Sequence, residues 1–469
     1  MTENRCARPA LLSSEVLPAL LYFALMLAIG VLVRDIALQP ALLTRLADFP
    51  QALKEFDRVT DPGSFLIAAR DIANTGWVAP GNMWVVRLWP PGFMLLEGWI
   101  LRLGGDSIPF IGVLLVFACL AYTAMLVLTR RLLLQFTNSF AAFALPLIPF
   151  AFPFARVFLL EPAGLVLGEG FAIAFFVMGA VLLLSCSQNY RLRKAVWAGA
   201  LLAASAYFRS QYELLISFLT AAAIPFGIWY WLRTRRSAQD GRAHAPGKNS
   251  AIKAMAVSLI AAHVLMAPWR VHNYLDSGST SWVHTQQLVI RNALATQEEL
   301  TKMNAWFVME GGGDLACRFE PEYCGKTEPS LFYKAFFKNI IPWYHAKAQL
   351  IGRYWFSSPE NLGRLIYPNT TVDIIYSGIN LLILALTVPL LVFIRRWNGA
   401  PAMYWLQSAF YACFFCIVTF VQFEARYFYL IKFFSTVTFV VLLAVACKMS
   451  RSAVRRISLD AAPSLDETK

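Results

Sequence analysis

Residues 108–129 read IPFIGVLLVFACLAYTAMLVLT, a run without a charged side chain that ends directly before Arg130 and Arg131. The hydrocarbon core of a bilayer is about 30 Å thick, so a helix that crosses it needs roughly 20 consecutive apolar residues. Because the run meets this length, it predicts a transmembrane helix.

Similar apolar runs recur along the whole chain and set its class. The chain has 469 residues, of which 58% are hydrophobic and only 15% are charged. A soluble domain could not bury that much apolar surface. The first run lacks a small-residue cleavage site and is too long for a signal peptide, so we expect it to stay in the membrane. The sequence predicts an all-α polytopic membrane protein with about ten transmembrane helices, at 15–33, 108–129, 140–158, 165–186, 195–208, 214–231, 251–268, 372–394, 403–421 and 428–447.

Positively charged residues gather in alternate connections between these runs. Lys and Arg in short loops favour the cytoplasmic side of a membrane. All six basic groups fall on one side of a ten-helix count, so we expect cytoplasmic termini and two large outer loops, at 34–107 and 269–371. The net charge of +13 largely reflects this topology, which makes nucleic-acid binding a poor interpretation. The six groups are Arg5/Arg8, Arg130/Arg131, Arg191/Arg193/Lys194, Arg233 to Lys253, Arg395/Arg396 and Lys448 to Arg456.

The two outer loops divide the chain into three parts. Residues 1–268 form an N-terminal membrane module that includes the first outer loop, 269–371 form the large extracytoplasmic loop, and 372–469 hold the last helices and a basic tail. Apolar residues recur at helical spacing over 43–56, and 64–74 also has the pattern of a helix. We expect both segments to be interfacial helices on the outer membrane surface.

Most of the eight cysteines lie in or at the ends of apolar runs, where a small residue facing lipid or core is the simplest interpretation. Cys317 and Cys324 differ, because they share the large outer loop and flank a short polar stretch. We expect them to form a disulfide bond in an oxidising compartment. The outer-loop histidines, His272, His284 and His345, show no HExxH or other close ligand pairing, so we assign no metal site.

The first outer loop holds the most informative polar stretch of the chain. An aspartate followed by proline marks the start of a helix, with the carboxylate as the cap and the proline ring at the first helical position. Asp61 is therefore either a helix cap alone or a cap that also does chemistry, and the helix dipole keeps it ionised. The stretch begins Asp61-Pro62-Gly63-Ser64-Phe65 and continues through Ala68, Arg70, Asp71 and Gly76 to Trp89-Pro90-Pro91-Gly92.

Together with motifs farther along the chain, this stretch resembles the signature of the GT-C membrane glycosyltransferases. The branch it resembles, glycosyltransferase family 39, contains the protein O-mannosyltransferases and the bacterial lipid A aminoarabinose transferase. Pro62 stands where the mannosyltransferases carry a second acidic residue, and His272 stands where Arg is common. The further matches, in the family's order, are Glu161-Pro162, Phe208-Arg209-Ser210-Gln211, Ala267-Pro268-Trp269-Arg270-Val271-His272-Asn273-Tyr274 and Glu424-Ala425-Arg426-Tyr427.

The resemblance implies transfer of a sugar from a polyprenyl phosphate to a hydroxyl group, with inversion at the sugar carbon. A single displacement of this kind needs a base for the acceptor proton and cations for the departing phosphate. Asp61 is the expected base. Asp57, one turn earlier, is either its competitor or a solvated loop charge.

Cations at the predicted outer helix ends are the candidates for phosphate binding, since Arg can hold phosphate oxygens through two hydrogen bonds. The alternative for each is that it only reaches the lipid headgroups. Glu161 is expected to contact the acceptor or orient a cation, unless it is a turn residue before Pro162. Glu169, inside the fourth run, is expected to pair with Arg156 or Arg209. The candidate cations are Arg209, Arg270 and Arg426, with Arg87 and Lys432 behind them.

The resemblance also implies partners and a location. The donor is a polyprenyl-phosphate sugar, no cofactor is expected, and the acceptor is an envelope lipid, polysaccharide or protein. We expect a bacterial inner membrane protein with a periplasmic active site. Two alternatives stay open: a lipopolysaccharide or O-antigen polymerase or ligase, which would rely on Arg and His in the large loop, and a secondary transporter, which would show internal repeats.

Overall fold

The computed structural model describes residues 9–32, 42–48, 61–160, 167–239, 246–278, 312–324, 326, 328–356, 371–420 and 425–460. Within these residues all regular structure is helical, and no strand is present. The chain is an all-α polytopic membrane protein, as its apolar runs predict.

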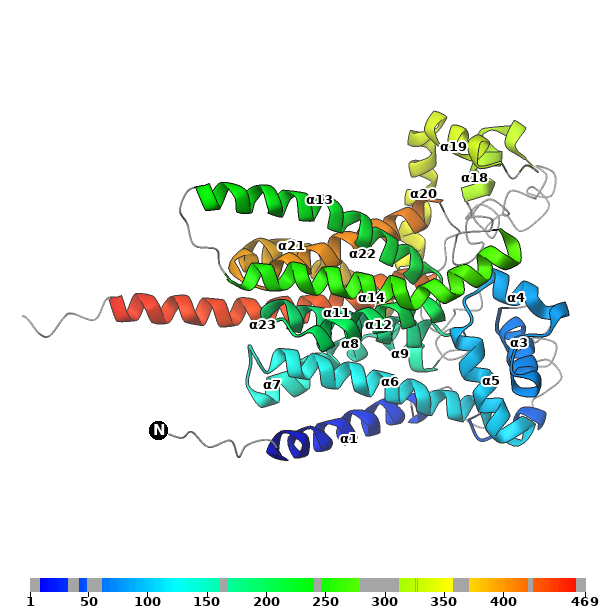
Figure 1. The fold of residues 1–469 in the computed structure, drawn as a ribbon, viewed down its shortest axis with the longest axis horizontal. Coiled ribbons are helices and arrows are strands. Elements are labelled where there is room, and N and C mark those ends of the chain that lie inside the picture. The colour runs from blue at the N-terminus through cyan, green and yellow to red at the C-terminus, as the bar shows by residue number, and fades with distance from the viewer. Residues whose placement is uncertain are drawn as a thin grey trace, which may run out of the picture.

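The long helices lie side by side along one axis (Figure 1). The beginning of α1 and the end of α23 lie at the same end of this bundle. An even number of passes explains this placement, and the predicted number of ten stays a prediction. The long helices are α1 (Pro9–Leu32), α6 (Phe110–Leu133), α11 (Glu169–Gln188), α12 (Leu192–Phe208), α13 (Gln211–Gln239), α14 (Pro246–Ser277), α21 (Thr371–Phe393), α22 (Ala400–Phe420) and α23 (Ala425–Asp460).

Eight helices in the described part of the chain are long and apolar enough to cross a membrane, and each coincides with a predicted run. The other two predicted runs, 195–208 and 140–158, do not form helices of that length. α12 has 17 residues. The run at 140–158 is divided into α7 (Ser139–Ala144), η5 (Leu145–Leu147), α8 (Ile148–Ala151) and α9 (Pro153–Leu160). Pro146, Pro149 and Pro153 explain the division, because proline cannot donate a helical hydrogen bond and its ring clashes with the preceding turn.

One end of the bundle, here called the loop end, carries the remaining helices (Figure 1). The expected helix at 64–74 lies within α3, whereas most of the expected helix at 43–56 lies outside the described residues; only η2 (Leu46–Asp48) is seen there. The helices from the first loop are α3 (Asp61–Thr75), η3 (Pro80–Asn82), α4 (Met83–Leu88), α5 (Gly92–Gly104) and η4 (Gly105–Ser107), and those from the second are α18 (Gly312–Phe319), η6 (Pro321–Tyr323), α19 (Pro329–Lys338) and α20 (Ile340–Trp355).

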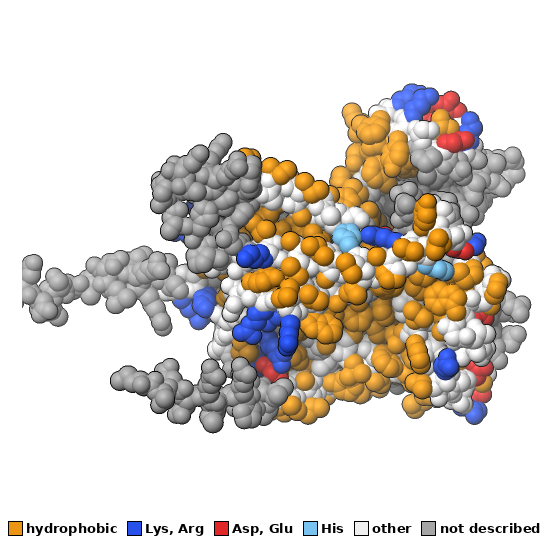
Figure 2. Space-filling view, in the orientation of Figure 1, with side chains coloured by type: hydrophobic (Ala, Val, Ile, Leu, Met, Phe, Trp, Pro, Cys, Tyr) orange, Lys and Arg blue, Asp and Glu red, His pale blue; other side chains and the backbone are white. Residues whose placement is uncertain are grey.

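Basic residues mark the opposite end, here called the basic end. α6 finishes there with Arg130 and Arg131, and η8 (Ile394–Arg396) carries two more arginines at the end of α21. Figure 2 shows large groups of Lys and Arg on the visible face toward this end. The charge asymmetry that the sequence predicts is therefore present in the fold, and the assignment of the basic end to the cytoplasm stays a prediction.

Small residues let the central helices pack closely. A Cβ atom at Gly199 of α12 would collide with the backbone oxygen of Ser258 on α14, so the two backbones approach as only glycine permits. The Ser258 hydroxyl also donates to the Ala195 oxygen across this contact, at 2.9 Å. Close backbone approach and interhelical hydrogen bonds are the usual sources of helix association in lipid. They hold α12, whose far end carries Arg209, in a fixed position.

Candidate functional site

α3 presents the predicted catalytic stretch at the loop end. Asp61 is its first residue and Pro62 follows, so the helix starts where the Asp-Pro pair predicts. Phe65, Ala68 and Ile72, at helical spacing, are all at most 4% exposed and form the face that packs against the rest of the protein. Several residues of the quoted stretch are therefore present for packing.

The turn after α3 is held by one carboxylate. Asp71 accepts hydrogen bonds from the Ala79 backbone amide at 3.0 Å and from Asn82 Nδ2 at 2.8 Å. Gly76 has a φ of 88°, a backbone conformation that favours glycine after a helix end. Both residues fix how the chain leaves α3 and enters α4.

Gly92, the last residue of the Trp-Pro-Pro-Gly motif, allows α5 to touch α12. A Cβ atom there would lie 2.6 Å from the Tyr207 backbone oxygen and 2.9 Å from its carbonyl carbon. Because those neighbours are backbone atoms, they cannot rotate away as a flexible side chain could. The motif is thus explained as the place where the first-loop helices meet the membrane bundle.

A set of edge-to-face and tilted aromatic rings continues this contact from α3 into the bundle. The Phe65 ring lies 5.9 Å from the ring of Phe93 on α5, measured between centroids. Phe93 in turn lies 6.1 Å from Phe208, at the end of α12, and 5.9 Å from Phe171, near the start of α11. Aromatic pairs at these separations add to the stabilisation from burial alone. The start of α3 therefore belongs to one packed unit with the helix ends that carry Arg209 and Glu169.

Arg209 forms a buried ion pair at this junction. Its Nη2 lies 2.8 Å from Oε1 of Glu169, and the side chains are only 6% and 1% exposed. Gln211 Nε2 donates to the other carboxylate oxygen at 2.8 Å, and Arg209 Nη1 donates to the Leu167 oxygen at 3.4 Å. Of the two partners that the sequence left open for Glu169, the structure therefore selects Arg209.

Arg270, on the last turns of α14, belongs to a second polar cluster between α13 and α14. It donates from Nε and Nη2 to Glu213 Oε1, both at 3.2 Å. Its Nη1 lies 3.0 Å from Nδ1 of His263, and since Arg can only donate, that ring nitrogen accepts. The ring proton then sits on Nε2 and is donated to Thr220 Oγ1 at 2.8 Å. With Arg270 27% exposed, this cluster is the more accessible of the two.

Two other predicted cations lie in different surroundings. Arg87 of α4 pairs with Asp276 at the end of α14, through Nη2 to Oδ1 at 2.9 Å. This hydrogen bond, together with the opposite charge, raises the pKa of Arg87. Lys432 of α23 is 2% exposed, and its Nζ donates to the Trp355 oxygen at 2.5 Å. Its ammonium also lies 4.9 Å from the Trp355 ring centroid, so it serves the contact of α20 with α23.

Some predicted residues fall beyond what the structure describes. Asp57 and Glu161 lie outside the described residues altogether. For Asp61 and Arg426 only the backbone is described, as the first residue of α3 and the second of α23. Their roles stay predictions.

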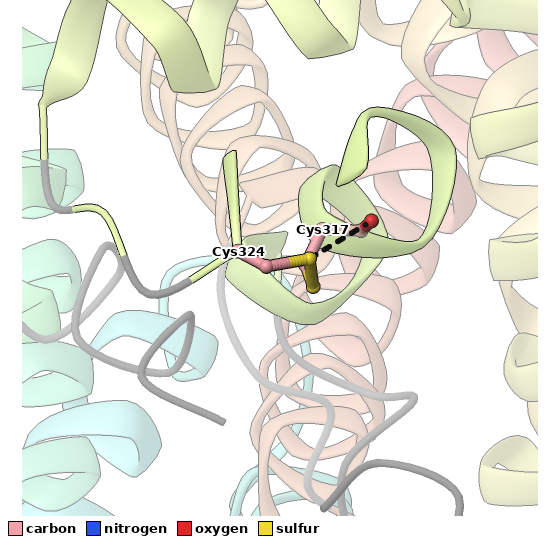
Figure 3. The surroundings of a disulfide bond; sticks show 2 residues. All are labelled: Cys317 and Cys324. Carbon is pink, nitrogen blue, oxygen red and sulfur yellow. Dashed lines mark hydrogen bonds between the residues drawn. A yellow bond between two sulfur atoms is a disulfide. The ribbon is translucent and has the colours of Figure 1, made fainter. Parts of the chain in front are cut away.

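Cys317 and Cys324 form the expected disulfide bond (Figure 3). It closes the turn from α18 to η6 in a small loop-end domain, here called the disulfide module (residues 312–355 as described). The module has its own core of Leu315, Tyr323, Phe332, Phe336 and Trp343. Burial, with a smaller contribution from Glu328, raises the pKa of Tyr323 to about 12. In the described part of the chain, no group of three or more His, Cys, Asp or Glu side chains is placed to hold a metal ion.

Three residues of these clusters were missed in the sequence: Glu213, His263 and Asp276. His263 lies in an apolar run and Glu213 directly precedes one, and an ionisable residue in a membrane segment normally marks a partner or a cavity. That rule would have drawn attention to both. Asp276 carries no comparable signal, because an acidic residue at a helix end beside a loop is ordinary.

Comparisons with known proteins give a fold likeness. No protein-family model matches the sequence, and no curated protein matches it either. Among solved structures, the chain is similar to the archaeal oligosaccharyltransferase AglB from Archaeoglobus fulgidus, in complex with an inhibitory peptide and a dolichol-phosphate, with 12% identity and a TM-score of 0.48 over 96% of this chain and 52% of that one. This chain thus spans about half the length of AglB. It is also similar to ArnT from Cupriavidus metallidurans bound to undecaprenyl phosphate, with 12% identity and a TM-score of 0.36 over 92% of this chain and 78% of that one. At these scores the likenesses carry no argument about activity, which has to be argued from the residues.

Proposed function

We propose that this chain is an integral membrane glycosyltransferase. It moves a sugar from a polyprenyl-phosphate donor to a hydroxyl group of an envelope lipid, polysaccharide or protein. The reaction takes place at the loop end, on the outer face of a bacterial inner membrane. The acidic first loop and the motifs that follow it in the order of the GT-C glycosyltransferases support this proposal.

The observation that carries the proposal is the packing of α3 on α5, which in turn contacts the end of α12. The helix that begins at Asp61 is joined through the Phe65, Phe93 and Phe208 rings to the junction that holds Arg209. A carboxylate at one helix start and a guanidinium at a nearby helix end are the two kinds of group that this transfer needs. The helices that carry them, α3 and α12, are joined through buried aromatic rings of α5, which favours a fixed geometry for the reaction.

In the proposed reaction the acceptor oxygen attacks the anomeric carbon of the sugar as the bond from that carbon to the phosphate oxygen breaks. The acceptor proton passes to the Asp61 carboxylate, and the polyprenyl phosphate leaves with the bonding electron pair. Attack from the face opposite the leaving group inverts the configuration of the sugar.

The two arginines have different parts in this proposal. Arg270, partly exposed and held by Glu213 and His263, binds the donor phosphate from the membrane side, because a guanidinium suits phosphate oxygens. Arg209 is almost fully buried against Glu169 and keeps a Nε that has no hydrogen-bond partner among the described residues. It stabilises the negative charge that builds on the departing phosphate, and Glu169 and Gln211 fix its orientation.

The test replaces Asp61 by Asn in full-length protein expressed in a deletion strain. We expect loss of the envelope glycan or lipid modification that the parent strain makes, with a normal amount of protein in the membrane. The measurement is mass spectrometry of extracted lipids and glycans from the parent, the deletion strain and the complemented strains.

Asp106→Asn is the matched control. Asp106 is an exposed acid of the same loop, 61% exposed and 4.0 Å from Arg70, and its replacement should leave the modification intact. Asp57→Asn separates the two candidate bases. Normal modification in the Asp61→Asn strain would reject Asp61 as the base, and an unchanged profile in the deletion strain would reject the transferase itself.

A further inference from the structure

We propose that the disulfide module rests on the outer leaflet of the lipid bilayer through an apolar stripe on α19 and α20. The stripe consists of Tyr333, Phe337, Ile340 and Ile341, which are 51%, 67%, 41% and 83% exposed. This inference concerns how the module meets the membrane and does not depend on the proposed glycosyl transfer.

α19 has two apolar faces. One packs into the core of the disulfide module, and the other, which is exposed, carries the stripe. Phe332, Ala335 and Phe336 of α19 point into the module core and are at most 7% exposed. Tyr333 and Phe337 follow each other at a spacing of four residues on the neighbouring face, and Ile340 and Ile341 extend that face to the start of α20. Large apolar side chains gathered on an exposed surface usually mark a contact with a partner or a membrane.

The attachment of the module places the stripe beside the membrane-spanning surface. Trp343 Nε1 donates to the Thr419 oxygen near the end of α22 at 3.0 Å, and the Phe336 ring lies 4.9 Å from that of Phe420. Tyr344 stacks on Phe415 of α22, with centroids 6.0 Å apart. Phe415 is 59% exposed on a helix that crosses the membrane, so it faces lipid. The apolar surface therefore continues from the lipid-facing side of α22 onto the module.

The direction of the stripe is that of a surface lying on a membrane. In Figure 1, α20 runs across the direction of the long helices, and the module projects sideways past α13. In Figure 2, its hydrophobic side chains are on the side turned back along the bundle, where the bilayer would lie, and its charged side chains are on the other side. The charged side includes the pairs Lys334–Glu322, at 3.2 Å, and Lys338–Glu320, at 2.7 Å.

A bilayer surface fits this arrangement better than a protein partner does. A helix that lies in the membrane interface buries one apolar face several ångströms deep and keeps its charges toward water. α19 and α20, which carry the stripe, lie at the loop end of the bundle, where the long helices finish (Figure 1). Lys334 and Lys338, both more than 60% exposed, are paired with Glu322 and Glu320 and keep the neighbouring face of the module charged and toward water.

The test uses full-length protein with p-benzoyl-phenylalanine in place of Phe337 or, separately, Ile341. Each variant is reconstituted as a single copy in nanodiscs of phosphatidylethanolamine and phosphatidylglycerol, irradiated, and analysed by intact-protein mass spectrometry. We expect lipid adducts at both positions, several-fold more abundant than for the same group at Lys334, one residue from Tyr333 on the water side. Two separate stripe positions keep the test valid if one variant fails to fold.

Two outcomes would overturn the proposal. Equal lipid adducts at 334, 337 and 341, or none at the two stripe positions, would show that the stripe does not enter the bilayer. Adducts between two copies of the chain in vesicles, in place of lipid adducts, would assign the stripe to self-association.

Discussion

The loop end is built from two regions that are stabilised in opposite ways. The first, here called the junction, joins α3 and α5 to the ends of α11 and α12 through buried aromatic rings, a glycine contact and the Arg209–Glu169 pair. The second is the disulfide module, which has a core of its own, one covalent bond and ion pairs at its surface. Aromatic packing and ion pairs occur in both regions, but the Arg209–Glu169 pair of the junction is buried, whereas the lysines of the two module pairs are exposed.

The difference predicts different costs for a change. A buried ion pair that loses one member leaves an uncompensated charge without water, which costs several kcal/mol, whereas an exposed pair contributes little. The junction should therefore respond to single substitutions with loss of both stability and activity. The module should loosen locally while the membrane bundle stays folded.

The strongest test of this contrast is Arg209→Ala. It leaves the Glu169 carboxylate, 1% exposed, without its cation, and we expect a loss of about 3–5 kcal/mol of stability together with loss of sugar transfer. Thermal denaturation of the detergent-solubilised protein and the glycan profile of the complemented strain measure the two effects. Arg45→Ala, which removes one member of an exposed pair with Asp48, should change stability by only about 0–1 kcal/mol.

A double variant separates structure from chemistry at the junction. Replacing Arg209 and Glu169 together by Leu removes both charges, so part of the lost stability should return. Transfer should not return, because the cation for the phosphate is still missing. A fully active double variant would mean that the pair serves folding alone.

The second test opens the disulfide in the module with Cys317→Ser. In the chain-entropy account, a closed loop of this size stabilises by about 2–3 kcal/mol. We expect faster proteolysis within 312–355 and an unchanged melting temperature of the bundle. Cys447→Ser, which removes an exposed free cysteine, is the control. A bundle that melts with the module would contradict the separation of the two regions.

The fold was predictable where the sequence carries a long periodic signal. Eight apolar runs became spanning helices, because length and the lack of charge are sufficient for that prediction. The run at 140–158 was interpreted as continuous because its hydropathy is high, but hydropathy does not register three prolines that divide a helix. The positions of the prolines indicate where this run is divided, and its apolar composition does not.

The site was predictable only in part, because some of its contacts join residues that are far apart in the sequence. Glu169 stands out because an ion inside an apolar run needs a partner, and the sequence offers Arg209 as one of two possible partners, with Arg156 as the other. The cluster of Arg270 with Glu213 and His263 joins residues up to 57 positions apart, a contact that no local pattern specifies. Likewise Gly92 is recognisable as a motif residue, but its reason, the Tyr207 backbone, is visible only in three dimensions.

The third test adds one methyl group to the junction with Gly92→Ala. Its Cβ would lie 2.6 Å from the Tyr207 oxygen, so α5 must move away from α12, at a cost of about 1–3 kcal/mol. Because α5 carries α3 with it, we expect reduced transfer at a nearly normal protein level. Gly81→Ala is the matched control, since nothing lies within 4 Å of a Cβ there. Equal activity of the two variants would show that the α5–α12 distance does not matter.

The smallest effect, and the one that completes the contrast, is the pH dependence of the module. Hydrogen bonds from Lys338 and Asn339 hold the pKa of Glu320 below its ordinary value of 4.5, and the hydrogen bond to Glu320 raises the pKa of Lys338 above 10.5. A lowered carboxyl pKa stabilises the fold above pH 4.5 and this contribution is lost as pH falls through the lowered value. The raised ammonium pKa stabilises below pH 10.5, and its contribution is lost as pH rises through the raised value.

Hydrogen exchange of peptides from α18 and α19, corrected for intrinsic rates, should therefore show constant protection between these limits and a small decrease beyond each. Glu320→Gln should remove the acid-side decrease, and an unchanged decrease in that variant would assign it to another group.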